Sequence, residues 1–182
     1  KPVTPASLMA SMRRLLSRTD SGEQSRNQLA EQAKKDLENL IGARVLLAED
    51  HPINQQVASE ILSSFGFEVE VANNGKEAVE KVEESINNRF DLVLMDIQMP
   101  VMDGYEAATL IRNNKDDAYF QSLPILSMTA HALRSDKEKC LAFGMNEHLT
   151  KPIVINELVE ALTRWIKPRQ GMSPQASAIS KE

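Results

Sequence analysis

Residues 93–104 read Val-Leu-Met-Asp-Ile-Gln-Met-Pro-Val-Met-Asp-Gly, and this segment is the most informative part of the sequence. Its apolar start is typical of a parallel strand that is buried on both faces. The predicted strand is followed by one acid, Asp96, and a turn is predicted over residues 100–104. Because open α/β sheets place their chemistry just beyond the carboxyl ends of their strands, Asp96 is a candidate functional residue. Taken alone, an acid in this position can also serve only as a helix cap.

Outward from this stretch, short apolar runs alternate with helical patterns over residues 44–167, which is typical of βαβ units and a parallel sheet. Five strands are predicted, over Arg44–Ala48, Phe67–Ala72, Phe90–Met95, Ile125–Met128 and Glu147–Thr150. Five helices are predicted to follow them, over Pro52–Phe65, Lys76–Ser85, Tyr105–Asn113, Leu133–Phe143 and Ile155–Ile166. In the second of these helices, the residues expected to face inward are Ala78, Val79, Val82 and Ile86.

The strict alternation of strands and helices predicts an α/β fold with a doubly wound, five-stranded parallel sheet of the flavodoxin-like kind. The expected strand order is 2-1-3-4-5, which puts the first and third strands side by side at the switch point of the sheet.

The composition of the 182-residue chain excludes several classes of protein. A net charge of −5 gives no reason to expect binding to nucleic acid or an anionic membrane, and an aromatic content of 4% leaves few side chains for base stacking. Cys140 is the only cysteine, so it has no disulfide partner, and we interpret it as a small buried residue on a helix. The sequence has no apolar run of about 18 residues and no signal-peptide pattern. We expect a cytoplasmic segment, which is compatible with a parent protein anchored in the inner membrane.

Three more predicted strands are followed by residues that can carry chemistry. The first strand is followed by Glu49 and Asp50, the fourth by Thr129 and the fifth by Lys151. With the first and third strands adjacent, Glu49, Asp50 and Asp96 converge. Each pair of these charges at ~4 Å repels by roughly 4 kcal/mol at an effective dielectric of about 20. Such a cluster must protonate or bind a cation, and oxygen ligands without His or Cys favour Mg²⁺.

The same residues suit phosphoryl transfer. A carboxylate such as Asp96 is the nucleophile in aspartyl-phosphate chemistry, and a divalent cation neutralises charge as the phosphoryl group moves. Lys151 would bridge Asp96 and the incoming phosphoryl oxygen, and the Thr129 hydroxyl would donate a hydrogen bond to that oxygen. A cis peptide between Lys151 and Pro152 would fit a tight turn that aims the ammonium group inward.

Each of these residues also has a purely structural interpretation. Glu49-Asp50 can be a solvated loop that caps the helix starting near Pro52, and Thr129 can cap the fourth helix. A lysine before a proline, such as Lys151, is usually a surface residue. The occurrence of all four at successive strand ends favours one shared site over four separate structural roles.

Residues 44–167 resemble the receiver domain of two-component response regulators over its whole length. The motifs that carry the resemblance are Glu49-Asp50, Asp96 within Met-Asp-Ile-Gln-Met-Pro-Val-Met-Asp-Gly, Thr129-Ala130 and Lys151-Pro152. The resemblance implies transfer of a phosphoryl group from the phosphohistidine of a histidine kinase to Asp96.

A metal site follows from the same resemblance. The implied ligands of Mg²⁺, or of Mn²⁺ in its place, are Asp50, Asp96 and the backbone carbonyl of Gln98. Glu49 would act mainly through a metal-bound water.

The resemblance also implies a conformational switch. Thr129 would move towards the phosphate on activation and draw an aromatic side chain inward. That aromatic position holds His148 instead of the more frequent Tyr or Phe. Gln98 and His131, two positions after the aspartate and the threonine, are expected to set how quickly water removes the phosphate.

Residues 48–58 look like receivers fused to hybrid sensor histidine kinases, in which an Asn at position 54 recurs. Residues 1–16 parallel residues 151–166, since both segments begin with Lys-Pro and share a Leu and an Arg at equivalent positions. The expected organisation is a remnant of a preceding receiver-like domain over 1–16, a linker and helix over 17–43, the receiver domain over 44–167, and a disordered linker or tail over 168–182.

The expected function is that of a phosphoacceptor receiver in a two-component phosphorelay, from a hybrid sensor histidine kinase. Its partners would be the phosphohistidine domain of a kinase and a histidine phosphotransfer domain. A second copy of the chain could bind through the fourth helix, fifth strand and fifth helix, or through the N-terminal extension. The chain's own catalysis would be limited to accepting the phosphoryl group on Asp96 and hydrolysing it, whereas the parent would be a histidine kinase.

Other functions fit less well. A dehalogenase-type phosphohydrolase needs a second Asp where Gln98 stands, and the chain has no Gly-x-x-x-x-Gly-Lys loop for a nucleoside triphosphatase. Two alternatives stay open, namely a receiver-fold scaffold that signals without phosphorylation and a stand-alone response regulator.

Overall fold

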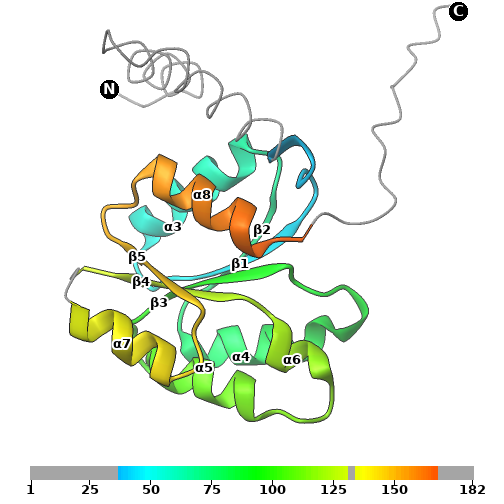
Figure 1. Ribbon diagram of the computed structural model, residues 1–182, viewed down its shortest axis with the longest axis vertical. Coiled ribbons are helices and arrows are strands. Elements are labelled where there is room, and N and C mark those ends of the chain that lie inside the picture. The colour runs from blue at the N-terminus through cyan, green and yellow to red at the C-terminus, as the bar shows by residue number, and fades with distance from the viewer. Residues whose placement is uncertain (1–36, 131–133, 168–182) are drawn as a thin grey trace, which may run out of the picture.

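The computed structural model describes residues 37–130 and 134–167, and every structural statement below refers to these residues. Figure 1 shows them as a central sheet with helices on both of its faces. The expected domain remnant at residues 1–16, the tail at 168–182 and His131 lie outside the described residues. The roles proposed for these segments stay predictions.

Five parallel strands form the sheet, in the predicted order β2-β1-β3-β4-β5. The strands are β1 Arg44–Ala48, β2 Glu68–Ala72, β3 Leu92–Asp96, β4 Ile125–Thr129 and β5 Glu147–Thr150. In β1, Leu47 lies opposite Val71 of β2 on one side and opposite Leu94 of β3 on the other. The doubly wound fold is thus confirmed, and the carboxyl ends of β1 and β3 are neighbours at the switch point.

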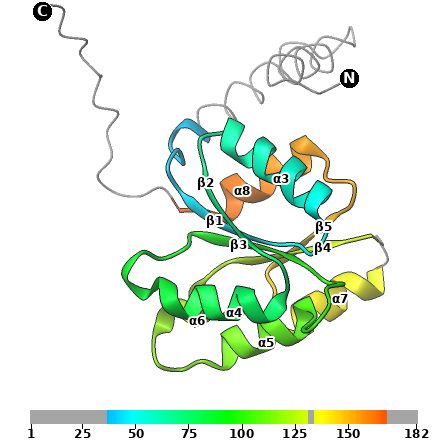
Figure 2. The same cartoon turned by 180° about the vertical axis from the view of Figure 1, so that it is seen from behind.

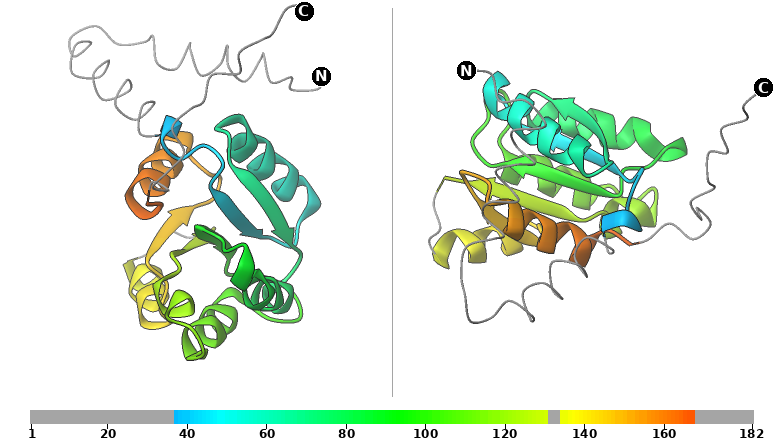
Figure 3. Two further views of the ribbon diagram at one scale, coloured as in Figure 1. Left: turned by 90° about the vertical axis from the view of Figure 1, so that its right-hand side faces the viewer. Right: turned by 90° about the horizontal axis from the view of Figure 1, so that it is seen from above.

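The helices form two layers that enclose the sheet. They are α3 Pro52–Ser64, α4 Gly75–Glu84, α5 Gly104–Asn113, α6 Ala118–Ser122, α7 Arg134–Ala142 and α8 Ile155–Trp165. Helices α3 and α8 cover one face, and α4 to α7 lie on the other (Figures 1 and 3). Figure 2 shows the same two layers from behind, with α3 and α4 on opposite sides of the sheet. Among the described residues, no helix is long and apolar enough to cross a lipid bilayer.

The strands divide their side chains between two cores. In β1, Val45 and Leu47 pack with α3 and α8, and Leu46 packs with the opposite layer. All three side chains are fully buried. Successive residues of a strand point to opposite faces, so a sheet covered on both faces needs an unbroken apolar run. The core also includes Leu40, which is 4% exposed and lies N-terminal to the expected domain boundary at residue 44.

The second predicted helix ends one residue earlier than expected, with a consequence for the core. Helix α4 stops at Glu84, and a 3-10 turn (η1) follows over Ser85–Asn87. Ser85 takes the buried position, and its hydroxyl donates to the carbonyl oxygen of Val82 at 2.7 Å. Ile86 therefore points outwards with 47% of its surface exposed, and the prediction that it faces inward is wrong. The predictions for Ala78 and Val82 are confirmed, since both are fully buried.

Helix α6 was not predicted, and it breaks the strict alternation of strands and helices. It is five residues long, too short for a helical period to show in the sequence. Its first turn is capped by the Asp117 side chain, which accepts a hydrogen bond from the backbone N–H of Tyr119 at 2.8 Å. Phe120 is 1% exposed, so the helix fills the core between α5 and β4.

Candidate functional site

Three carboxylates meet where β1 and β3 end side by side. Glu49 and Asp50 directly follow β1, and Asp96 is the last residue of β3. One oxygen atom from each of the three side chains lies within 4.8 Å of the other two. Glu49 and Asp96 are only 2% and 6% exposed, whereas Asp50 is exposed. The structure thus brings together the three acids that the sequence marks as candidates.

Lys151 enters this acidic group from the end of β5. Its Nζ lies 2.5 Å from Oε2 of Glu49 and 2.6 Å from Oδ2 of Asp96. The Lys151–Pro152 peptide is cis, as the tight turn suggested. One ammonium group between two buried carboxylates leaves a net negative charge, before the exposed Asp50 is counted. The site is therefore suited to a further cation.

The surroundings of the site raise the pKa of both Asp96 and Lys151. Burial raises the pKa of Asp96, and the nearby charge of Glu49 raises it further, although the hydrogen bond from Lys151 acts in the opposite direction. Burial on its own would lower the pKa of Lys151, but the hydrogen bonds with Asp96 and Glu49 outweigh it and raise that pKa. A lysine partner usually lowers the pKa of an aspartate. Here the lysine is shared with a second acid in an enclosed site, so the burial of Asp96 dominates.

The loop after β3 holds Asp96, the candidate nucleophile, through hydrogen bonds from backbone N–H groups. The backbone N–H of Gln98 donates to Oδ1 of Asp96 at 3.2 Å, and that of Gly104 donates to the carbonyl oxygen of Ile97 at 3.0 Å. A Cβ atom at Gly104 would clash with the backbone carbonyl of Asp96, so only glycine fits where the loop closes. The predicted turn over residues 100–104 therefore returns the chain against the strand end.

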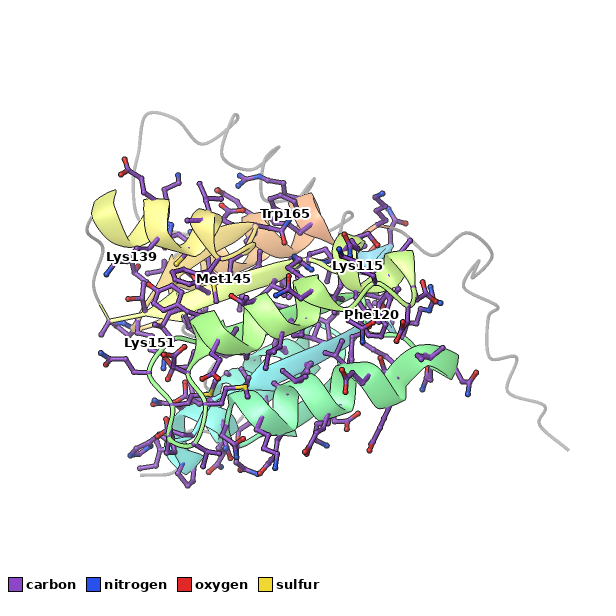
Figure 4. The ribbon with its side chains drawn as sticks, turned by 90° about the horizontal axis from the view of Figure 1, so that it is seen from below. Lys115, Phe120, Lys139, Met145, Lys151 and Trp165 are labelled. Atoms are coloured by element: carbon purple, nitrogen blue, oxygen red, sulfur yellow. The ribbon has the colours of Figure 1, made fainter. Side chains whose placement is uncertain are left out.

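The carboxylates open into a cleft of about 410 Å³. Thr129, the last residue of β4, lies in its wall and is half-buried. The residues that line the cleft are Glu49, Asp50, His51, Asn54, Asp96, Ile97, Gln98, Tyr105, Thr129, Ala130, Lys139 and Lys151. No sequence pattern predicts Tyr105 or Lys139 in this cleft. Figure 4 shows Lys139 and Lys151 at the same end of the molecule, opposite to Lys115.

The first turn of α3 contacts Glu49 through two amide side chains. Nδ2 of Asn54 donates to Oε1 of Glu49 at 2.9 Å, and Nε2 of Gln55 donates to the backbone carbonyl of Glu49 at 2.6 Å. In the sequence, Asn54 stood out only through the resemblance to hybrid kinases, and no role followed from it. The available signal was the spacing, because an amide on the first turn of a helix can reach back to an acid just before that helix.

His148 lies on β5 beside Ser127 of β4. Neighbours in register share a face, and the Ser127 hydroxyl lies 3.0 Å from Sγ of Cys140 on α7, so His148 faces the α7 layer. Its Nδ1 is buried and has no hydrogen-bond partner within the described ranges. Cys140 is 1% exposed, as predicted for a small buried residue on a helix.

Fold and site together define a class of signalling protein. The chain matches the family model of the response regulator receiver domain over residues 45–163, and it belongs to that family. This result confirms the resemblance drawn from the four strand-end motifs.

Relatives with assigned functions include sensor kinases. The chain is 40% identical to the sensor protein GacS of Pseudomonas syringae pv. syringae over 122 residues, which is 67% of this chain and 13% of that protein. It is 39% identical to hybrid signal transduction histidine kinase I of Dictyostelium discoideum over 129 residues, which is 70% of this chain and 7% of that protein. The chain thus spans only a small part of these relatives.

Two solved structures bear on the site. One is the receiver domain of sensor histidine kinase PA1611 from Pseudomonas aeruginosa PAO1, with a magnesium ion coordinated in its active site cleft. It is 41% identical with a TM-score of 0.60, and the match covers 68% of this chain and 97% of that one. The other is the receiver domain of the Saccharomyces cerevisiae response regulator Ssk1 with the histidine phosphotransfer protein Ypd1. It is 33% identical with a TM-score of 0.60, over 69% of this chain and 89% of that one.

Proposed function

We propose that this chain is the phosphoacceptor receiver of a two-component phosphorelay and that Asp96 takes a phosphoryl group from a phosphohistidine. One observation carries the proposal. Asp96 is held by Lys151 in an enclosed acidic group, yet it lines the open cleft through which a phosphodonor can reach it.

In the proposed reaction, a carboxylate oxygen of Asp96 attacks the phosphorus atom of the phosphohistidine. The new P–O bond forms as the P–N bond breaks, and the imidazole leaves with a proton from the donor or from solvent. Lys151 neutralises charge on Asp96 and on the incoming phosphoryl oxygen. The Thr129 hydroxyl donates a hydrogen bond to that oxygen. Each of these groups lines the same cleft, which supports the assignment.

The acidic group fits Mg²⁺, because its donor set holds only oxygen atoms and its net charge stays negative beside Lys151. The proposed ligands are Asp50, Asp96 and the backbone carbonyl of Gln98, with Glu49 in contact through a water molecule. Mn²⁺ can replace Mg²⁺, since it prefers the same ligand types. When bound, the metal neutralises charge on the phosphoryl oxygens during transfer. The magnesium ion in the cleft of the Pseudomonas aeruginosa receiver supports this assignment.

Phosphorylation would also change the conformation of the domain. The phosphoryl group itself carries roughly −1.5 to −2 charges, and Thr129 moves inward to compensate them. His148 follows Thr129, because both lie on neighbouring strands at the α7 side of the sheet. Gln98 and His131 then set the access of water to the phosphate.

The parent protein is proposed to be a hybrid sensor histidine kinase, given the identities with such kinases. The proposed partners are its phosphohistidine domain and a histidine phosphotransfer domain, and the complex of Ypd1 with a related receiver supports the second. A cytoplasmic location is proposed, with the parent anchored in the inner membrane. A homodimer through α7, β5 and α8 or through the N-terminal extension is proposed as well. The proposed domain organisation is the one expected from the sequence, with the receiver domain over residues 44–167. It is preceded by a domain remnant over 1–16 and a linker and helix over 17–43, and it is followed by a linker or tail over 168–182.

Phosphorylation with acetyl phosphate and Mg²⁺ tests the proposal, with intact-mass spectrometry as the readout. We expect one added phosphate on the wild type and none on Asp96→Asn. Asp116→Asn removes an exposed acid far from the site and should be labelled like the wild type. Equal labelling of the wild type and Asp96→Asn would refute the assignment. Absence of any adduct on the wild type would favour the alternative of a receiver-fold scaffold.

A further inference from the structure

Glu49 is the most enclosed acid of the site, and both of its carboxylate oxygens are engaged. Oε1 accepts from Nδ2 of Asn54 at 2.9 Å and from the backbone N–H of His51 at 3.4 Å. Oε2 accepts from Nζ of Lys151 at 2.5 Å. The side chain therefore has one oxygen on the α3 side and the other on the side of Asp96.

The start of α3 explains why an amide is available to Glu49. His51 is the N-cap residue, but its side chain makes no capping hydrogen bond, and Pro52 begins the helix. The first turn of α3 contains no acidic residue, and the Glu49 carboxylate, which accepts from the His51 N–H, is a negative group next to this positive helix end. Gln55 holds the Glu49 backbone carbonyl at 2.6 Å and also donates to Oδ1 of Asn73 at 3.0 Å. The helix start thus fixes the backbone of Glu49 through Gln55 and its side chain through Asn54.

We propose that Asn54 is a positioning residue of the phosphorylation site, and that it acts by holding the Glu49 carboxylate in one orientation. Without the Asn54 amide, the long contact with the His51 N–H is the only one that Oε1 keeps within the described part of the chain, and the side chain can rotate. Rotation would remove Oε2 from Lys151 and from the place where Glu49 receives metal-bound water. The inference rests on the proposed function, because the magnesium site is part of that proposal.

The expected consequence is weaker magnesium binding. Loss of a partner that orients a metal-binding group typically lowers metal affinity 10–100-fold. Glu49 acts through water, so we expect the lower end, a loss of about 10-fold in Mg²⁺ affinity for Asn54→Leu. Asn54 is exposed, so leucine at this position leaves the packed core unchanged.

The test is isothermal titration of the full chain with MgCl₂. The matched control is Gln56→Leu, which removes an exposed amide from the same turn. Among the described residues, this amide bonds only to Glu60, at 3.0 Å. We expect the Mg²⁺ affinity of Asn54→Leu to fall about 10-fold. Gln56→Leu should bind Mg²⁺ like the wild type. Unchanged or tighter Mg²⁺ binding by Asn54→Leu, or an equal loss in Gln56→Leu, would overturn the inference.

A double-mutant cycle separates positioning from a general structural effect. If Asn54 acts through Glu49, Asn54→Leu has no further effect on Mg²⁺ affinity in a Glu49→Ala background. If the losses of Mg²⁺ affinity from the two single substitutions multiply in the double variant, Asn54 acts independently of Glu49. Labelling of wild-type Asp96 by acetyl phosphate is measured alongside. If wild-type Asp96 is labelled normally and Asn54→Leu binds Mg²⁺ like the wild type, only this inference is overturned. If wild-type Asp96 is not labelled, the proposed function is overturned.

Discussion

Replacing Asp96 by asparagine should make the domain more stable near neutral pH while abolishing phosphorylation. The sign of this change in stability follows from the pKa of Asp96. Burial and the charge of Glu49 raise this pKa above its usual value. An acid whose pKa is raised on folding binds its proton more tightly in the folded state. Stability therefore falls as the pH rises from the unfolded pKa through the folded pKa. Above that window the wild type carries the full cost of a buried charge, and Asp96→Asn does not.

The magnitude follows from the spacing of the two buried acids. With oxygens of Glu49 and Asp96 within 4.8 Å, their repulsion is about 3.5 kcal/mol at an effective dielectric of about 20. Asparagine removes this repulsion and the cost of burying the Asp96 charge, but it also removes the attraction of Asp96 for Lys151. Lys151 keeps its ion pair with Glu49 at 2.5 Å. We expect a net gain of about 1 kcal/mol in the free energy of unfolding, since the opposing terms largely cancel.

Urea unfolding followed by circular dichroism measures this gain. The variant should be more stable than the wild type at about pH 7.5, and the difference should shrink as the pH falls towards about 4, because the raised pKa of Asp96 favours its protonation in the folded wild type. Asp116→Asn, in an exposed loop, serves as the control and should change little. A variant that is less stable than the wild type at the higher pH, or a gain that is the same at both pH values, would show that the buried charge of Asp96 does not destabilise the fold.

Three further predictions concern the loop, the rim of the cleft and the switch. Val101 has a positive φ of 70° and is 80% exposed, so Val101→Asn should stabilise the domain by about 1 kcal/mol in urea unfolding, whereas Val101→Ile should give no gain. Lys139 lines the cleft, so Lys139→Gln should slow labelling by the anionic acetyl phosphate about 2-fold at low salt and less at high salt. Lys137→Gln, on the same helix but outside the cleft lining, should be labelled at the wild-type rate, and equal slowing would argue against a local role of Lys139. Beryllofluoride with Mg²⁺ should shift amide resonances along Arg134–Ala142 and Glu147–Thr150, and shifts confined to the neighbours of Asp96 would count against a conformational switch.

The sequence carried enough information for the sheet and for the convergence of the acids. Continuous apolar runs such as Val93–Met95 occur where both faces of a strand are covered, and the rules for doubly wound sheets then set the strand order. That order makes the ends of β1 and β3 neighbours, so Glu49 and Asp96 meet although 47 positions separate them in the chain. Here the backbone topology alone decides which residues come together.

Details that depend on side-chain rotation or on short elements could not be predicted. Asn54 contacts Glu49 through its side-chain amide, and Lys139 of α7 lines the cleft, neither of which follows from a helical period. Ile86 fits the helical period, but it lies beyond the residue at which α4 ends. Ile53 and Val57 also fit a helical period, yet they are 66% and 53% exposed, because the buried face of α3 is formed by other residues.

Chemical trapping shows whether Asp96 itself becomes phosphorylated. The wild-type chain is treated with acetyl phosphate and Mg²⁺, and the acyl phosphate is then reduced with borohydride, which converts a phosphorylated aspartate into homoserine. Peptide mass spectrometry locates the converted residue. We expect homoserine at position 96 alone. Homoserine at position 50, or none in a chain that binds Mg²⁺ normally, would contradict it.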